Sequence, residues 1–182
     1  MLKRHLILLA TILLAVASLS CNQRTDRDEG GVILTISDFD GLPVLFQVNG
    51  QDLFQVGELT LSNIPKDPNG LTSSLMDIEL RSFEVTFTRA DAGTRTPTAR
   101  VEAFFSNVPV SGTSVIDNLD LMDAEQLRNP PLSDLLFVNG AFDRETGSDV
   151  IKLNLHLRFF GRTLAGDNIA SNTASFTIEF VP

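Results

Sequence analysis

The sequence predicts an all-β protein in which two antiparallel sheets pack as a β-sandwich. Three observations indicate this class: apolar and polar residues alternate through most of the chain, turn-forming stretches separate the alternating runs, and only one short stretch favours a helix. Several short strands with frequent turns are typical of a sandwich of immunoglobulin-like outline. We therefore expect that outline, with the one short helix in a crossover between strands.

The alternating runs predict the strands and the face that each strand turns toward the core. Shorter runs occur at residues 32–36, 59–61 and 176–180. In the clearest run, residues 151–159, the apolar side chains share one face, and the other face carries Lys152, Asn154, His156 and Arg158. Because neighbouring side chains of a strand point to opposite faces, each run predicts a strand that is buried on one side.

Residues 76–87 contain a change of phase that predicts a β-bulge. Apolar side chains occupy even-numbered positions up to Leu80 and odd-numbered positions from Phe83 onward. A continuous regular strand would turn one of these two sets toward solvent. One extra residue near Arg81 and Ser82 would instead keep both sets on the core side. A strand that bends between the two sheets is the alternative.

Turn chemistry predicts how the strands are connected. The tetrapeptide LFQV occurs at residues 45–48 and again at 53–56, on either side of Asn49–Gly50. Apolar alternation around Asn-Gly is a strong hairpin signal, so we expect these two strands to pair with each other. Clusters of turn-forming residues predict further turns at 66–70, 90–94, 143–149 and 165–168.

One stretch, residues 120–131, favours a helix. It carries Leu121, Met122 and Leu127 with good helix formers between them. Asn129, which two prolines follow, would end the helix. We expect one or two helical turns within a long crossover.

The first twenty residues predict an export signal. Lys3 and Arg4 form a short positive region, residues 6–17 are almost entirely apolar, and residues 18–20 are mostly small. The apolar run is shorter than the about 20 residues that a membrane-spanning helix needs. A retained N-terminal anchor helix is the alternative.

The sequence SLSC, which ends at Cys21, resembles the lipobox of bacterial lipoproteins. That family prefers Leu at the third position before the cysteine, where this chain has Ser18, and Leu19 follows one place later. The resemblance implies that Cys21 carries diacylglycerol and that cleavage occurs just before it. It also implies a lipid anchor in the bacterial envelope, in the outer membrane where there are two membranes. A free thiol near an ordinary cleavage site is the alternative.

After Cys21 the sequence predicts a tether and then a single domain. Residues 22–31 are polar and end in two glycines, so we expect a flexible tether that reaches at most about 35 Å. Residues 32–182 contain no cysteine, and this length can bury a core without a disulfide. Residues 77–97 loosely resemble strands of uncharacterised exported bacterial sandwich domains, a likeness that implies the fold and no function.

Composition excludes several classes of function. Removing residues 1–20 takes away two basic residues and no acidic one, so the formal net charge moves from −9 to −11. Such a chain repels anionic polymers and has no strong basic cluster, so we do not expect nucleic acid as a partner. With His156 as the last histidine and no cysteine after Cys21, a zinc site of Cys and His ligands is excluded. No G-x-S-x-G motif presents a serine to His156, which we expect to face solvent.

Carboxylates are the remaining candidates for chemistry. Asp38 with Asp40, and Asp143 with Glu145, are closely spaced in predicted turns, where acidic side chains commonly bind local backbone. Either pair could supply acid–base groups, and Asp38 with Asp40 could belong to a calcium site, although the rest of an EF-hand loop is missing. This pattern predicts no catalytic residue, no firm metal site and no cofactor.

Two further features could mark a binding surface. Arg89, Arg95 and Arg100 surround the predicted tip of a hairpin and could contact anionic headgroups or another protein, with a solvated loop as the alternative. The side chains within Phe104–Phe105 and within Phe159–Phe160 point to opposite faces of their strands. We expect these strands to be buried on both faces, and an exposed partner-binding patch is the alternative.

Together these features predict a non-catalytic lipoprotein that is tethered to the bacterial envelope and serves as an interaction or structural module. Its expected partners are the membrane, through lipid on Cys21, and an unknown envelope protein or glycan. Two other functions stay open. One is a calcium-dependent or glycan-binding surface module, and the other is an enzyme that uses carboxylates.

Overall fold

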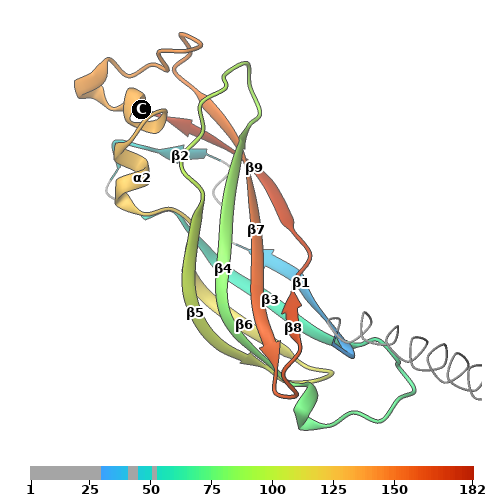
Figure 1. Ribbon diagram of the computed structural model, residues 1–182. Coiled ribbons are helices and arrows are strands. Elements are labelled where there is room, and N and C mark those ends of the chain that lie inside the picture. Colours follow the sequence, from blue (N-terminus) through green and yellow to red (C-terminus); the bar gives the residue numbers. More distant parts are fainter. Residues whose placement is uncertain (1–29, 41–44, 51–52) are drawn as a thin grey trace, which may run out of the picture.

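The computed structural model describes residues 30–40, 45–50 and 53–182, and it confirms the predicted β-sandwich (Figure 1). The predicted export signal, Cys21 and the tether up to residue 29 lie outside the described residues. In the described part, two sheets pack against each other around one apolar core.

The first sheet has the strand order β1-β3-β6 and is antiparallel. Its strands are β1 (Val32–Asp40), β3 (Gln55–Pro65) and β6 (Thr113–Asp120). The second sheet has the order β2-β9-β7-β4-β5, and β2 runs parallel to β9. Its strands are β2 (Leu45–Gln47), β4 (Ile78–Arg89), β5 (Arg100–Val108), β7 (Ile151–Thr163) and β9 (Ala174–Val181), and β8 (Asn168–Ala170) also pairs with β7.

This strand order is immunoglobulin-like in outline, with three strands in the first sheet where an immunoglobulin domain has four. β1, β3 and β6 correspond to strands A, B and E of one sheet, and β4, β5, β7 and β9 correspond to strands C, C′, F and G of the other. The chain has no tryptophan and only one cysteine, so it lacks the tryptophan and the inter-sheet disulfide of antibody domains. The fold by itself assigns no function.

The core follows the alternation in the sequence. On β7, alternate residues from Ile151 to Phe159 are buried, and the polar residues between them lie on the outer face. The ring centroids of Phe83 and Phe159 lie 5.9 Å apart inside this core. The ring of Phe104 lies 6.2 and 6.0 Å from these two rings, so β4, β5 and β7 share one aromatic cluster.

The adjacent phenylalanines divide between the two faces of the second sheet. Phe104 packs against the core, whereas Phe105 is 82% exposed on the outer face of β5. Phe160 is half-buried beneath the guanidinium of Arg158, whose Cζ lies 5.3 Å from the ring centroid. The expected burial of both faces is therefore wrong for β5.

The predicted bulge is present in β4. The register of β4 shifts between Leu80 and Ser82 against both neighbouring strands. Against β7, Arg81 is the extra residue, whereas against β5 the extra residue lies on β5, where Phe104 and Phe105 face Arg81. Leu80 and Phe83 are both buried despite their different positions in the alternation. Because the bulge shifts the alternation by one residue, the even-numbered apolar residues before it and the odd-numbered ones after it all face the core.

The variant Gly161→Ala is expected to lower the free energy of unfolding by about 1–3 kcal/mol. Gly161 lies opposite Leu80, and a Cβ at Gly161 would approach the backbone oxygen of Glu79 to 2.6 Å. That oxygen belongs to the strand beside the bulge and cannot swing away like a side chain. Denaturant unfolding followed by circular dichroism measures the loss. In the control Gly31→Ala, the new Cβ meets only Cε of Met76, at 3.4 Å, and equal losses in the two variants would contradict the prediction.

The predicted hairpin around Asn49–Gly50 is wrong. β2 pairs with β9 in the second sheet, whereas β3 pairs with β1 and β6 in the first. The turn itself exists, because the N–H of Gly50 donates to the carbonyl of Gln47. Each copy of LFQV contributes a phenylalanine to the core, and the rings of Phe46 and Phe54 meet edge to face, 5.3 Å apart. Of the other four predicted turns, those at 66–70, 143–149 and 165–168 are confirmed, whereas residues 90–92 form a bend at the start of the loop between β4 and β5.

The predicted helix is confirmed as α2 (Ala124–Arg128), in the crossover from β6 to β7. Asp123 caps it: the Asp123 carboxylate accepts from the N–H of Gln126, and the Gln126 side chain accepts from the N–H of Asp123. Two short 3₁₀ helices, η4 (Leu132–Leu135) and η5 (Phe137–Asn139), follow in the same crossover.

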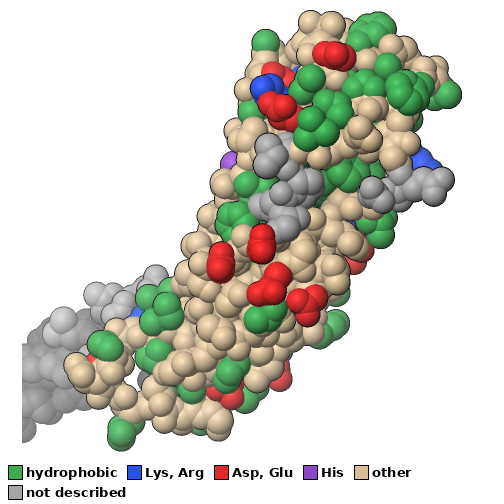
Figure 2. All heavy atoms as spheres, turned by 180° about the vertical axis from the view of Figure 1, so that it is seen from behind, with side chains coloured by type: hydrophobic (Ala, Val, Ile, Leu, Met, Phe, Trp, Pro, Cys, Tyr) green, Lys and Arg blue, Asp and Glu red, His purple; other side chains and the backbone are tan. Residues whose placement is uncertain are grey.

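The strands run along the length of an elongated molecule whose two ends differ (Figure 1). We call the end with α2, η4 and η5 the apex. We call the end with Gly30, η3 (Ser74–Met76) and the turn between β7 and β8 the base. Seen from behind, hydrophobic side chains gather at both ends, and acidic side chains lie across the middle (Figure 2).

Candidate functional site

An ion-pair network at the apex joins three segments of the chain. Arg89 ends β4 with a side chain only 3% exposed, and its guanidinium donates to both carboxylate oxygens of Asp91, at 2.6 and 3.0 Å. The same guanidinium donates to Oδ2 of Asp143 at 2.7 Å. Nη2 of Arg95 donates to Asp134 of η4 at 2.7 Å and to Asp143 at 3.1 Å. The network therefore holds together the β4–β5 loop, η4 and the turn before β7.

Asp143 lies at the centre of this network and is completely buried. Each of its oxygens accepts two hydrogen bonds: Oδ2 from Arg89 and Thr146, and Oδ1 from Arg95 and the backbone N–H of Glu145. Burial would raise the pKa of Asp143, but the hydrogen bonds from Arg89, Glu145 and Thr146, with the charge of Arg89, outweigh it and lower the pKa to about 2. Asp143 is thus ionised at neutral pH.

The candidate acid–base pair Asp143 and Glu145 is arranged to hold loops. Glu145 accepts from the hydroxyl of Thr94 at 2.5 Å, from the N–H of Thr94 at 2.8 Å and from the N–H of Arg95 at 3.0 Å. The bonds from Thr94 and Arg95 lower the pKa of Glu145. Because both carboxylates are ionised and bound to loop donors at neutral pH, their geometry suits a structural role better than proton transfer.

Acid is expected to destabilise the protein as the pH falls from about 4 to about 2. The pKa of Asp143 falls from its ordinary 3.8 to about 2 on folding, so its stabilising contribution is fully present above pH 3.8 and is lost on approaching pH 2. Asp91 and Glu145, whose pKa values are also lowered, act in the same direction. Thermal unfolding by circular dichroism across this range measures the effect. We expect Asp143→Asn to show a shallower decline, and an equal decline would contradict the assignment.

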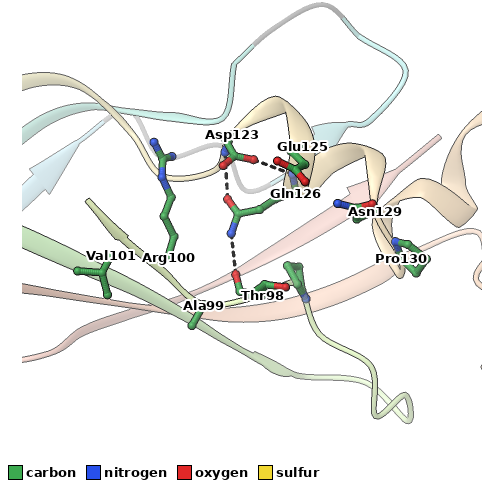
Figure 3. A pocket seen from close by; sticks show the side chains of 10 residues that line it. Thr98, Ala99, Arg100, Val101, Asp123, Glu125, Gln126, Asn129 and Pro130 are labelled. Atoms are coloured by element: carbon green, nitrogen blue, oxygen red, sulfur yellow. Dashed lines mark hydrogen bonds between the residues drawn. The ribbon is translucent and has the colours of Figure 1, made fainter. Parts of the chain in front are cut away.

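Arg100 lies apart from Arg89 and Arg95, on a groove of about 370 Å³ between β5 and α2 (Figure 3). Its guanidinium forms an ion pair with Glu102 and reaches the backbone oxygen of Asp120. The three arginines therefore do not form one positive patch. The groove is lined by Pro97, Thr98, Ala99, Val101, Asp123, Glu125, Gln126, Asn129 and Pro130 in addition to Arg100.

Residues 136–142, which we call the apex turn, display apolar side chains at the surface. Phe137 is 70% exposed and Val138 is 89% exposed, and Phe142 is exposed as well. Gly140 closes the turn with a φ of 109°, a left-handed conformation that favours glycine. Hydrophobic side chains gather at the upper end of the molecule in Figure 2, the end that carries the apex turn.

The backbone of the apex turn is held from two sides. Nδ2 of Asn49 donates to the carbonyl of Leu135, and Oδ1 of Asn49 accepts from the N–H of Phe137, both at 3.1 Å. On the other side, the buried carboxylate of Asp134 binds Arg95 of the ion-pair network. The exposed side chains therefore stand on a well-supported turn.

The sequence reasoning missed the apex turn, although a signal was present. Residues 135–138 are four consecutive apolar residues outside any alternating run, and Asn139–Gly140 follows them. Leu135 is buried and Leu136 packs against the core, so only Phe137 and Val138 of this run are exposed.

The calcium candidates Asp38 and Asp40 lie exposed on the last residues of β1, so the expectation that they lie in a turn is wrong. Strand register places Glu58 opposite Asp40, and Asp117 opposite Glu58, so four carboxylates form an acidic band across the first sheet. Among the residues that the structure describes, no group of three or more His, Cys, Asp or Glu is arranged to hold a metal ion. The band is a negatively charged surface, and it assigns no ligand.

His156 lies on the outer face of β7 between two hydroxyl groups. Its Nδ1 is 2.7 Å from Oγ of Ser175, and its Nε2 is 3.1 Å from Oγ1 of Thr88. A catalytic serine–histidine pair is oriented by a carboxylate behind the imidazole, whereas here a threonine hydroxyl takes that place. The arrangement links β4, β7 and β9 side by side.

Comparison with known proteins suggests no function for this chain, so a function has to be inferred from its residues. No family model matches the chain, and no curated protein matches it significantly. Of the helices in the described ranges, none combines the length and the apolar character needed to cross a membrane.

Proposed function

We propose that this protein is a non-catalytic lipoprotein, tethered to the bacterial envelope through Cys21, that binds a partner protein through its apex turn. The observation that carries the proposal is the position of the apex turn, at the end of the sandwich opposite Gly30 (Figure 1). A lipid on Cys21, a few residues before Gly30, would hold the base near the membrane and leave the apex turn available to a partner.

The chemistry of the apex turn supports binding to a protein. Phe137 and Val138 keep large apolar surfaces in water, which a partner with an apolar pocket would bury. Aromatic anchors of this kind often supply much of the binding energy of an interface. Because Asn49 and Asp134 already hold the turn, its backbone loses little conformational entropy when a partner binds.

The ionisable groups described at the apex support a non-catalytic role. Arg89, Arg95 and Asp143 bind one another, and Glu145 binds the backbone of the β4–β5 loop. Their charges are used inside the molecule to support the apex turn. A buried network of this kind favours one fixed arrangement of the loops.

A glycan is a second candidate partner, because the groove between β5 and α2 also lies at the apex (Figure 3). Arg100, Glu125 and Asn129 supply the polar and charged groups that sugar hydroxyls bind. The variant Glu125→Ala separates the two candidates, because it would weaken glycan binding in the groove and leave binding at the apex turn unchanged.

Affinity purification from the native envelope tests the proposed binding surface. We expect the double variant Phe137→Ser with Val138→Ser to recover the partner at least about tenfold less than the parent protein. Val115→Ser is the matched control, because Val115 is 51% exposed but lies on the outer face of the first sheet. All three proteins should unfold at the same temperature. Equal recovery by all three would contradict binding through the apex turn.

The anchor has a separate test. We expect Cys21→Ser to abolish labelling of the protein by fatty acid and to release it from the membrane fraction. If labelling and membrane partition are unchanged in Cys21→Ser, the lipoprotein assignment is wrong.

A further inference from the structure

Three exposed leucines lie on neighbouring turns at the base, and we call them the base leucines. Leu71 is fully exposed in the loop between β3 and η3, Leu75 is 57% exposed on η3, and Leu164 is 47% exposed in the turn between β7 and β8. The N–H of Leu164 donates to the carbonyl of Asp77, and the N–H of Ala165 donates to the carbonyl of Leu75. These bonds join the turn after β7 to η3, so the leucines stand on connected backbone.

The chain enters the sandwich among these same turns. A Cβ on Gly30 would lie 2.8 Å from Cδ1 of Ile169, so Gly30 is packed closely against β8. The carbonyl of Gly31 accepts from the N–H of Lys66, at the start of the loop that carries Leu71. The point where the preceding chain joins the domain is therefore fixed beside the base leucines.

The length of the preceding chain keeps the base close to any anchor on Cys21. Eight residues, 22–29, separate Cys21 from Gly30, and this chain extends over at most about 30 Å. The 13 residues of β7 alone extend over about 43 Å. An anchored domain thus has its base within reach of the bilayer, whereas its apex reaches the bilayer only when the sandwich lies flat.

The charges of the base are close to balance, in contrast to those of the whole chain. Residues 66–77 contain Lys66, Asp67 and Asp77, and residues 162–168 contain Arg162 and Asp167, so two basic and three acidic residues leave a formal charge of −1. The acidic band lies elsewhere, across the middle of the first sheet (Figure 2). Anionic headgroups would therefore meet only a small excess of negative charge at the base.

We infer that the base is a second membrane contact, in which the base leucines enter the boundary between lipid headgroups and acyl chains. This inference rests on the proposed anchoring through Cys21 and deepens it. The lipid supplies attachment, and the leucines supply orientation, since burying all three of them requires the sandwich to stand on its base. The apex turn then faces away from the bilayer, toward its partner.

Photo-crosslinking in intact cells tests this contact in the full-length chain. A benzophenone-bearing phenylalanine replaces Leu71 or Leu75 in two variants, and Val115 or Val138 in two control variants of comparable exposure. After illumination, mass spectrometry counts phospholipid adducts at each position. We expect several-fold more phospholipid adducts at the two base positions than at the two controls. In the triple variant Leu71→Ser, Leu75→Ser and Leu164→Ser, we expect lipid adducts at position 138 to rise, because the sandwich loses its preferred orientation.

Labelling of Cys21 by fatty acid is measured in the same cells and separates the two proposals. If Cys21 is labelled but the four positions give equal lipid adducts, the base contact is wrong and the anchoring stands. Protein adducts in place of lipid adducts at position 71 would overturn the base contact as well. If Cys21 carries no fatty acid, the anchoring fails, and the inference built on it fails too.

Discussion

Replacing Arg89 with methionine is expected to lower the free energy of unfolding by about 3–5 kcal/mol, since it removes one partner of a buried ion pair. Asp143 is completely buried, and Arg89 donates to it at 2.7 Å. Without Arg89, Asp143 would keep only its ion pair with Arg95, and Asp91 would lose the ion pair that the structure shows for it. Denaturant unfolding followed by circular dichroism is the appropriate measurement, because the chain has no Trp or Tyr for intrinsic fluorescence.

Two further variants make this prediction specific to burial. Lys152→Met removes a cation that pairs with Glu179 at 2.5 Å, but both side chains are more than a third exposed, so we expect a loss of only about 0–1 kcal/mol. The double variant Arg89→Met with Asp143→Leu should lose less than the sum of the two single variants, because no buried charge is left without its partner. Similar losses for Arg89→Met and Lys152→Met would show that the network contributes no more than a surface pair.

The variant Phe54→Ala is expected to cost about 3–5 kcal/mol of unfolding free energy. Phe54 is completely buried, and its ring lies 5.3 Å from that of Phe46 and 5.6 Å from that of Phe180. It precedes β3 of the first sheet, whereas its two aromatic neighbours belong to the second sheet. Truncating Phe54 therefore opens a cavity at a point where the sheets contact each other. The same measurement by denaturant unfolding and circular dichroism applies.

Phe137→Ala is the matched control for Phe54→Ala. It removes the same atoms from a side chain that is 70% exposed, so we expect a change within about 0.5 kcal/mol. A loss of more than that for Phe137→Ala would mean that the apex turn supports the fold instead of serving a partner. A small loss for Phe54→Ala would mean that the core repacks around the gap.

The strands and their faces could be predicted because burial on one side requires a local pattern in the sequence. Each half-buried strand must alternate, so Ile151 to Phe159 identified both β7 and its inner face. The bulge at Arg81 could be predicted as well, because an extra residue allows both Leu80 and Phe83 to face the same core. The helix α2 was recognisable from its helix formers and the prolines that follow it.

Strand pairing around Asn49–Gly50 could not be predicted, because a turn signal describes only a few residues. The dipeptide forms its turn, but the partner of β2 is chosen by contacts distant in sequence. Phe46 packs against Phe180, and the N–H of Val48 donates to the carbonyl of Val181. A local signal for a hairpin is overridden when both strands have better partners elsewhere in the core.

The candidate site was the least predictable part of the molecule. The sequence predicts a positive cluster of Arg89, Arg95 and Arg100 because these residues are closely spaced along the chain. It does not show which acidic residues they pair with. Asp134 and Asp143 reach two of these arginines only after the crossover folds back onto the β4–β5 loop. Net charge and spacing carry no information about such contacts. The role of the arginines in binding a partner stays a prediction.

The parallel pairing of β2 with β9 also determines when the domain can be completed. Leu45 and Glu179, which face each other across these two strands, lie near opposite ends of the folded domain in sequence. Contacts between such distant residues form late, because the long loop between them must first be closed. Until β9 is present, the second sheet lacks both the partner of β2 and one neighbour of β7, so the sandwich can be completed only when the chain is available through residue 181.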